Sequence, residues 1–335
     1  MVIPHLQQMN APSCICIKNV DGKLPLCCRL IYLNKSKMNT NKLIGMVKEH
    51  GYKGCVAEAF NIFSKNLKSI FFNTWAFALA YGFSTALLFL CVTFFKLHSG
   101  SRALLLCCLI PLLLSVGSTI ALYGRIFTQL TGFPLKLTCK RSAKVVVASI
   151  AYTVLLGCLL MLVSLVTDSL KPASVSMPVW ALGIYACCLI VFALLSLPLF
   201  YVFTKYMAEA DTRLHHIWWK SVATGFRHWG FIFSTQLLSF ICVLAVSLAV
   251  SVPYMIVNIA SFLSMMGTET MGDPSGLPSY FLVIEFFTVL FNNFLASFIF
   301  FFQVIVTYNM YESMEKRDKE RKAFQQDNSL EAKKD

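Results

Sequence analysis

The last apolar stretch of the chain carries a line of polar side chains that could do chemistry inside a membrane. Glu285, Asn292 and Gln303 fall within about 20° of one line when residues are placed about 100° apart around a helix. The line covers about 27 Å of helix. The opposite side carries Phe287, Phe291, Phe294, Phe298 and Phe301. Because carboxyl and amide groups are costly in hydrocarbon, we expect the polar line to face another helix and the phenylalanines to face lipid.

The preceding apolar stretch carries a matching line. Its members lie within about 60° of arc and are Gln236, Ser247, Ser251, Tyr254 and Asn258. Consecutive antiparallel helices would bring the two lines together. The candidate binding site is this polar seam, formed by Glu285, Asn292, Gln303, Gln236 and Asn258. Two interpretations stay open: ordinary hydrogen bonds between packed helices, or a polar pathway through the membrane.

Residues 204–230 gather groups that could bind a metal ion. They include Glu209, Asp211, His215, His216 and His228. Adjacent histidines on a helix point about 100° apart, which is poor geometry for sharing one ion. The three tryptophans of the same segment are typical of the headgroup layer of a membrane. We therefore expect interfacial anchoring there and no metal site.

Cysteines and catalytic motifs give little ground for an enzyme. Most of the 13 cysteines lie in apolar stretches, where a thiol acts as a small hydrophobe. The pairs Cys14/Cys16 and Cys27/Cys28 do not match the usual zinc-binding spacings. No GxSxG, P-loop or GxGxxG motif occurs. The sequence predicts a non-enzymatic protein that binds no metal and no cofactor. A membrane-embedded lipid enzyme remains an alternative that ranks below the two functions given at the end of this section.

These side chains need helices that cross a bilayer to position them. Of the 335 residues, 57% are hydrophobic and only 13% charged, whereas soluble domains carry about a quarter of charged residues. A crossing helix needs about 20 apolar residues. Six stretches meet this length, at residues 70–95, 103–123, 145–167, 179–203, 231–257 and 280–308. The sequence therefore predicts an all-α fold, a polytopic six-helix transmembrane bundle.

The basic residues predict the orientation of this bundle. The segment before residue 70, the loops 124–144 and 204–230 and the C-terminal tail hold 26 of the 29 Lys and Arg residues. Basic residues accumulate on the cytoplasmic side, so both termini are predicted to be cytoplasmic. The outer loops have no glycosylation sequon, which favours a bacterial inner membrane over a eukaryotic surface. The predicted partners are the lipid bilayer and membrane proteins or further copies of the chain, with no nucleic acid.

The two ends differ from the membrane domain at residues 70–308. Residues 1–37 show no apolar period, and we expect them to be disordered or a mis-assigned extension, with translation beginning at Met38. Residues 38–69 are predicted to be a cytoplasmic amphipathic lead-in. Residues 309–335 are predicted to be a charged cytoplasmic tail that continues the last helix.

A basic amphipathic segment precedes the first, third and fifth stretches. Lys65, Lys140 and Arg227 hold corresponding positions in AFNIFSKNLKSIFF, TCKRSAKVVV and SVATGFRHWGFIFS. Helices of this kind commonly lie in the headgroup layer on the cytoplasmic side. The layout of three lead-in-plus-hairpin units, over residues 55–310, resembles uncharacterised bacterial six-span families. It also loosely resembles the membrane domain of glycerophosphodiester phosphodiesterases, whose catalytic domain this sequence lacks. The resemblance implies a fold and carries no functional residue with it.

Two functions from different classes follow from these patterns. The first is a non-enzymatic membrane module, a scaffold or regulator that acts through helix packing and cytoplasmic interfaces. The second is a small transporter or channel that uses the polar seam between the fifth and sixth stretches. The seam residues decide between them, because packing needs only contact whereas transport needs a pathway.

Overall fold

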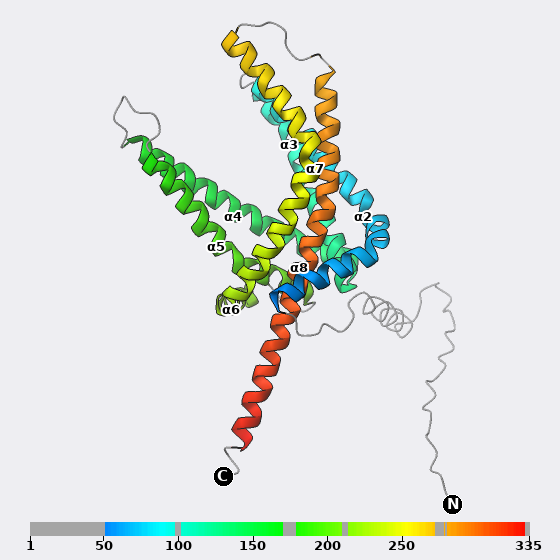
Figure 1. Cartoon of the computed structure of the whole chain (residues 1–335), viewed down its shortest axis with the longest axis vertical. Coiled ribbons are helices and arrows are strands. Elements are labelled where there is room, and N and C mark those ends of the chain that lie inside the picture. Colours follow the sequence, from blue (N-terminus) through cyan, green and yellow to red (C-terminus); the bar gives the residue numbers. More distant parts are fainter. Residues whose placement is uncertain are drawn as a thin grey trace, which may run out of the picture. The chain divides into compact units, whose positions relative to one another are not determined.

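The computed structural model describes residues 51–97, 102–169, 179–209, 214–271, 278 and 280–331. All of these residues belong to one unit of the chain, Met46–Asp335. They form seven helices and no strand (Figure 1). The helices are α2 (Tyr52–Leu97), α3 (Arg102–Thr131), α4 (Leu135–Ser169), α5 (Val179–Ala208), α6 (Leu214–Arg227), α7 (Trp229–Met271) and α8 (Phe281–Glu331).

Six of these helices are long and apolar enough to cross a membrane. They are α2, α3, α4, α5, α7 and α8, one for each of the six predicted stretches. The prediction of an all-helical structure with six helices able to span a membrane is therefore confirmed for the described residues. Most of the helices extend beyond the predicted stretches. Residues 1–37, Met38 and the four N-terminal cysteines lie outside the described residues.

Helices α2 and α8 form the most extensive pair of the bundle. Their antiparallel contact is lined with aromatic rings: Phe63 lies 6.4 Å from Phe301, and Phe71 stacks at 5.4 Å on Phe298. Farther along, Gly82 lies directly against the α8 backbone, where even a methyl group would meet the carbonyl oxygen of Leu290 at 2.9 Å. The first part of α2 crosses α8, and the helix then turns to run beside α3 (Figure 1).

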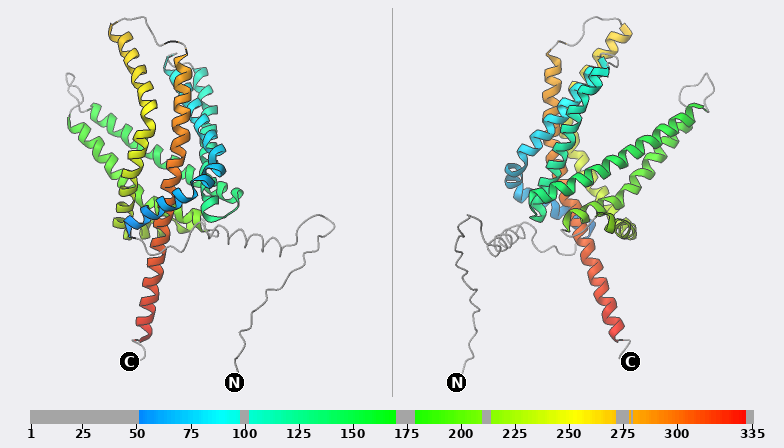
Figure 2. Two further views of the ribbon diagram at one scale, coloured as in Figure 1. Left: turned by 45° about the vertical axis from the view of Figure 1, so that its right-hand side comes forward. Right: turned by 180° about the vertical axis from the view of Figure 1, so that it is seen from behind.

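Helices α4 and α5 form a hairpin that, unlike the α2–α8 pair, contacts the other helices mainly at one end. Tyr152 of α4 donates a hydrogen bond of 2.7 Å to the carbonyl oxygen of Phe192 on α5, and the two rings stack at 3.9 Å. Near its start, α4 packs closely against α3. A side chain at Gly124 of α3 would collide with Cys139 of α4. Away from this end the hairpin diverges from the other helices (Figure 2). The hairpin is thus joined to the bundle mainly at one end.

The short helix α6 lies crosswise between the hairpin and α7 (Figure 2). It packs closely on α5, with Gly225 against Pro198. A compact apolar core forms where α5, α7 and α8 meet, and it comprises Leu197, Tyr201, Ile232, Met310, Tyr311 and Met314. Beyond this core α8 continues as one helix to Glu331, as predicted for the tail.

Candidate functional site

The structure brings the two predicted polar lines together at one point. Gln303 Nε2 of α8 donates to Gln236 Oε1 of α7 at 2.6 Å, and Ser239 Oγ donates to Gln303 Oε1 at 2.5 Å. Gln236 Nε2 in turn reaches Thr307 Oγ1 at 3.4 Å. We call these four residues the glutamine seam. Each of the two amides here both donates and accepts, so the seam stabilises the contact between α7 and α8.

The other members of the predicted seam are not joined to it. Asn258 donates to the carbonyl oxygen of Tyr254 in its own helix at 2.8 Å. Asn292 is partly exposed. Glu285 is buried, with 5% of its surface exposed, and among the described residues none is hydrogen-bonded to its carboxyl group. Within the described residues, the only hydrogen bond between two of the five candidates joins Gln236 and Gln303, and no continuous line of hydrogen bonds runs along the two helices.

The expectation that the phenylalanines of α8 face lipid is wrong for part of the helix. Phe301 is only 1% exposed, and Phe294 lies beside Phe71 at 6.4 Å. The reason is that α2 covers this side of α8, so that aromatic rings pack on each other instead of on lipid. Phe287 and Phe291, which lie nearer the start of α8, are exposed as predicted.

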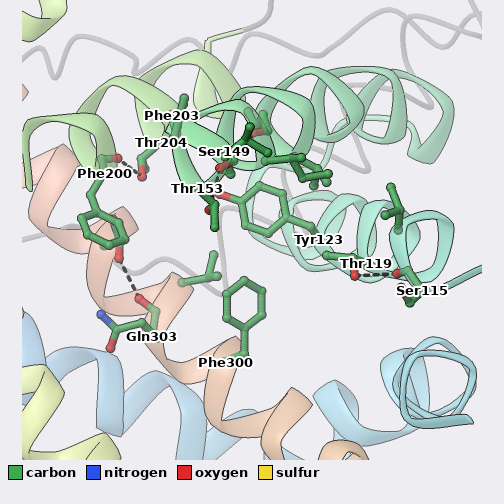
Figure 3. Close-up of a pocket in the computed structure, with 17 residues that line it drawn as sticks. Ser115, Thr119, Tyr123, Ser149, Thr153, Phe200, Phe203, Thr204, Phe300 and Gln303 are labelled. Carbon is green, nitrogen blue, oxygen red and sulfur yellow. Dashed lines mark hydrogen bonds between the residues drawn. The ribbon is translucent and has the colours of Figure 1, made fainter. Parts of the chain in front are cut away.

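A cavity of about 510 Å³ lies beside the glutamine seam, between α3, α4, α5 and α8 (Figure 3). Gln303 and Thr307 form part of its wall. Hydroxyl side chains from three other helices face it together with aliphatic and aromatic groups. The hydroxyl residues are Ser115, Thr119 and Tyr123 of α3, Ser149 and Thr153 of α4, and Thr204 of α5. No lining residue is charged. We call this space the hydroxyl-lined cavity.

Most of these hydroxyl groups already use their proton. Thr119, Ser149 and Thr153 each donate to the carbonyl oxygen four residues earlier in their own helix. Their oxygens therefore remain able to accept a hydrogen bond from a ligand. Tyr123 differs, because no described residue accepts its proton, and its hydroxyl points toward Ser149 and Thr153 (Figure 3). The cavity thus combines one free donor with several acceptors in an apolar setting.

A group of charged and phenolic side chains fixes the hairpin end next to this cavity. Lys205 Nζ lies 2.6 Å from Glu315 Oε1 of α8, and Tyr201 Oη donates to the same oxygen at 2.7 Å. Tyr311 Oη of α8 donates to Glu209 at 3.0 Å. We call these five residues the α5–α8 polar cluster. It ties the end of α5 to α8 through half-buried hydrogen bonds, which are stronger when one partner is charged.

Arg141 of α4 reinforces the same end of the hairpin. Its guanidinium group is buried and donates to the carbonyl oxygens of Tyr206, at 2.7 Å, and of Glu209. These are backbone acceptors at the C-terminus of α5, which a helix leaves unpaired. The guanidinium also lies 5.1 Å from the centre of the Tyr206 ring. One arginine therefore joins α4 to the end of α5.

The histidine-rich segment contacts an acidic residue of α8. His228 Nε2 lies 3.1 Å from Asp318 of α8, and Arg227 donates to both oxygens of the same carboxylate. Asp211 lies outside the described residues. Among the residues that the structure describes, no three His, Cys, Asp or Glu side chains gather in a way that could hold a metal ion. These contacts on Asp318 join the junction between α6 and α7 to α8.

Comparisons of the chain with protein families, with curated proteins and with solved structures found no match.

Sequence reasoning missed the hydroxyl-lined cavity, although one signal points to it. Ser115, Thr119 and Tyr123 are spaced four residues apart, as are Ser149 and Thr153. This spacing places each set along one side of its helix. Two such lines on consecutive helices indicate polar sides that face each other, by the same argument that led to the seam between α7 and α8.

Proposed function

We propose that this protein binds an uncharged amphipathic molecule within the membrane, in the hydroxyl-lined cavity, and acts as a non-enzymatic carrier or receptor for it. The observation that carries the proposal is the cavity itself: a space of about 510 Å³ whose wall has hydroxyl groups but no charge. Its volume lies within the range of about 300–1,000 Å³ usual for small-molecule sites. A charged ligand would find no counter-ion there, so a neutral one fits better.

The chemistry of the wall narrows the ligand further. The free Tyr123 hydroxyl would donate a hydrogen bond to a hydroxyl or carbonyl oxygen of the ligand. The oxygens of Ser149 and Thr153 would accept a hydrogen bond from a ligand hydroxyl group. The aliphatic and aromatic part of the wall, with Phe200 and Phe300, suits a hydrocarbon body. A long-chain alcohol or a similar neutral lipid has both parts. Such a molecule would enter from the bilayer, on the side where the hairpin diverges from the bundle (Figure 2).

The proposed setting is a bacterial inner membrane with both termini in the cytoplasm. The distribution of Lys and Arg supports this orientation, since 26 of 29 belong to segments on one side. In this orientation the α5–α8 polar cluster and Arg141 lie toward the cytoplasmic face, and the free end of the hairpin lies toward the outer face. The first part of α2 and α6 would then be the interfacial helices in the cytoplasmic headgroup layer.

Photolabelling of the full chain tests the proposal. The purified protein in nanodiscs is exposed to a long-chain alcohol that carries a diazirine, and labelled peptides are identified by mass spectrometry. We expect labels on α3, α4 and α8 at the cavity, and a severalfold loss of labelling in Tyr123→Phe. Tyr254→Phe is the matched control, because this tyrosine of α7 does not line the cavity. Equal labelling of both variants, or labels spread evenly over lipid-facing residues, would contradict the proposal.

A scaffold is the second candidate, and one observation favours it. The C-terminal part of α8 extends beyond the other helices (Figure 1), and its residues 319–326 are exposed. An exposed charged helix of this kind can bind a partner protein at the cytoplasmic face. Deletion of residues 319–335 separates the two functions: a scaffold loses its co-purifying partners, whereas photolabelling of the cavity persists.

A further inference from the structure

A second hollow, distinct from the hydroxyl-lined cavity, lies where the first part of α2 passes α7 and α8. Its volume is about 860 Å³, and its wall is formed almost entirely by hydrocarbon and aromatic groups. Phe60, Leu67 and Phe71 come from α2, Val246 from α7, and Phe298 and Phe302 from α8. We call this hollow the apolar groove. Unlike the first cavity, it offers no hydroxyl or amide side chain to a ligand.

One lining residue of the apolar groove is charged. Lys68 lines the groove and is exposed. Within the described residues no carboxylate pairs with it, and Glu58 is the only acidic residue anywhere along α2. Lys65, one turn earlier, adds a second exposed positive charge. The edge of the groove is therefore positive, and no acidic residue of the described part of the chain lines it.

An apolar hollow with a positive edge matches the chemistry of one membrane component. The hydrocarbon wall would hold an acyl chain, and the ammonium group would pair with a headgroup phosphate. The first part of α2 crosses α8 (Figure 1), with Phe63 beside Phe301 and Cys55 beside Ser313. This is near the end of the apolar stretch of α8, which suits a helix at the level of the headgroups. We propose that the apolar groove holds an acyl chain of an anionic phospholipid from the cytoplasmic leaflet, with its phosphate on Lys68.

This site is independent of the neutral ligand proposed for the hydroxyl-lined cavity, because the two hollows share no lining residue. Phe298 and Phe302 lie on the side of α8 that faces α2, whereas Gln303 and Thr307 face the cavity. A bound phospholipid would fill the space between the start of α2 and α7. It would thereby fix the position of α2 on the bundle.

Native mass spectrometry of the full chain tests the site. The protein is purified in detergent, mixed with equal amounts of phosphatidylglycerol and phosphatidylcholine, and the retained lipids are counted. We expect phosphatidylglycerol to be retained preferentially, and this preference to fall about fivefold in Lys68→Gln, as for the loss of one basic contact with an anionic lipid. Lys144→Gln, a matched change at an exposed lysine of α4, should leave the preference unchanged.

A second variant tests the hydrocarbon part of the groove. Ala57 lines it and is exposed, so Ala57→Trp fills the space without disturbing the core. We expect Ala57→Trp to abolish retention of both lipids while photolabelling of the hydroxyl-lined cavity persists. Equal effects of Lys68→Gln and Lys144→Gln, or equal retention of the two lipids by the unchanged protein, would overturn the proposal. A dimer that Ala57→Trp dissociates would also overturn it, by showing that a second copy occupies the groove.

Discussion

The pair α2–α8 and the hairpin α4–α5 are held in the molecule in opposite ways. The first pair is held by packing along its length, through stacked rings such as Phe71 on Phe298 and through the close approach at Gly82. The hairpin leaves most of α4 uncovered. In the most apolar part of each helix, 6% of the residues are buried in α4 and 33% in α8. The hairpin is held at one end, through Arg141 and the α5–α8 polar cluster.

The difference follows from the physics of helices in lipid. Lipid tails are as apolar as leucine, so burial of apolar surface does not drive two membrane helices together. Close backbone contact at small residues and hydrogen bonds do so instead. The α2–α8 pair is held mainly by the first means. The hairpin combines close contact at Gly124 and Gly225 with hydrogen bonds, all at the same end. Because these contacts are gathered at one end, we expect the hairpin to change its angle to the bundle more readily than the α2–α8 pair, which suits a wall of a ligand-binding cavity.

Loss of the arginine anchor should have the largest effect. Arg141→Ala removes a buried guanidinium and leaves the carbonyl oxygens of Tyr206 and Glu209 without this donor. Since hydrogen bonds to charged groups contribute about 1.5–3 kcal/mol each, we expect a loss of about 3 kcal/mol in the free energy of unfolding. Denaturation of the protein in mixed micelles measures it. Lys140→Ala, at the exposed neighbouring position, should change the free energy little.

The same variant tests whether the anchor sets the position of the hairpin. Spin labels at Leu165 on α4 and Ile259 on α7 occupy exposed positions away from the anchor. We expect the distribution of distances between them to broaden in Arg141→Ala and to stay narrow in Lys140→Ala. A narrow distribution in both would mean that contacts along the hairpin, and not its polar end, hold it in place.

Two glycines compare the packed pair with the hairpin directly. In Gly82→Ala the new methyl group would meet the backbone of α8, at 2.9 Å from the Leu290 oxygen, so the helices must separate. Overpacking of this kind costs about 1–3 kcal/mol. In Gly157→Ala on α4 nothing lies within 4 Å of the new group, and alanine favours the helix by up to about 1 kcal/mol. We expect opposite signs in the same denaturation assay, and equal changes would remove the contrast between the two regions.

The elements of this fold could be predicted from the sequence, and the pairing of its helices only in part. Six apolar stretches are visible because a bilayer imposes a minimum length on each helix. The contact of Gln236 with Gln303 could be inferred because the two amides need partners in hydrocarbon. The burial of Phe301 could not, because phenylalanine is equally at ease against lipid and against Phe63 of α2. The hydroxyl-lined cavity depends on the angle between two hairpins, which no spacing within a single helix encodes.

The smallest expected effect concerns the ion pair between the hairpin and α8. Lys205 and Glu315 are 20% and 23% exposed and lie 2.6 Å apart, but each has a further partner, since Glu209 and Tyr201 also contact them. Single substitutions therefore mix several contacts, and a double-mutant cycle of Lys205→Met with Glu315→Gln isolates the pair. We expect a coupling of about 1 kcal/mol, as for partly buried partners in direct contact.

The control is the pair Lys316–Glu320 within α8. Its two side chains are about half exposed and lie 3.8 Å apart. Exposed pairs of this spacing couple by about 0.3–0.5 kcal/mol. High salt should weaken the control pair more, because exposed charges are screened more than half-buried ones. If the two couplings prove equal, the ion pair does not anchor the hairpin, and Arg141 with the tyrosine hydrogen bonds must hold it alone.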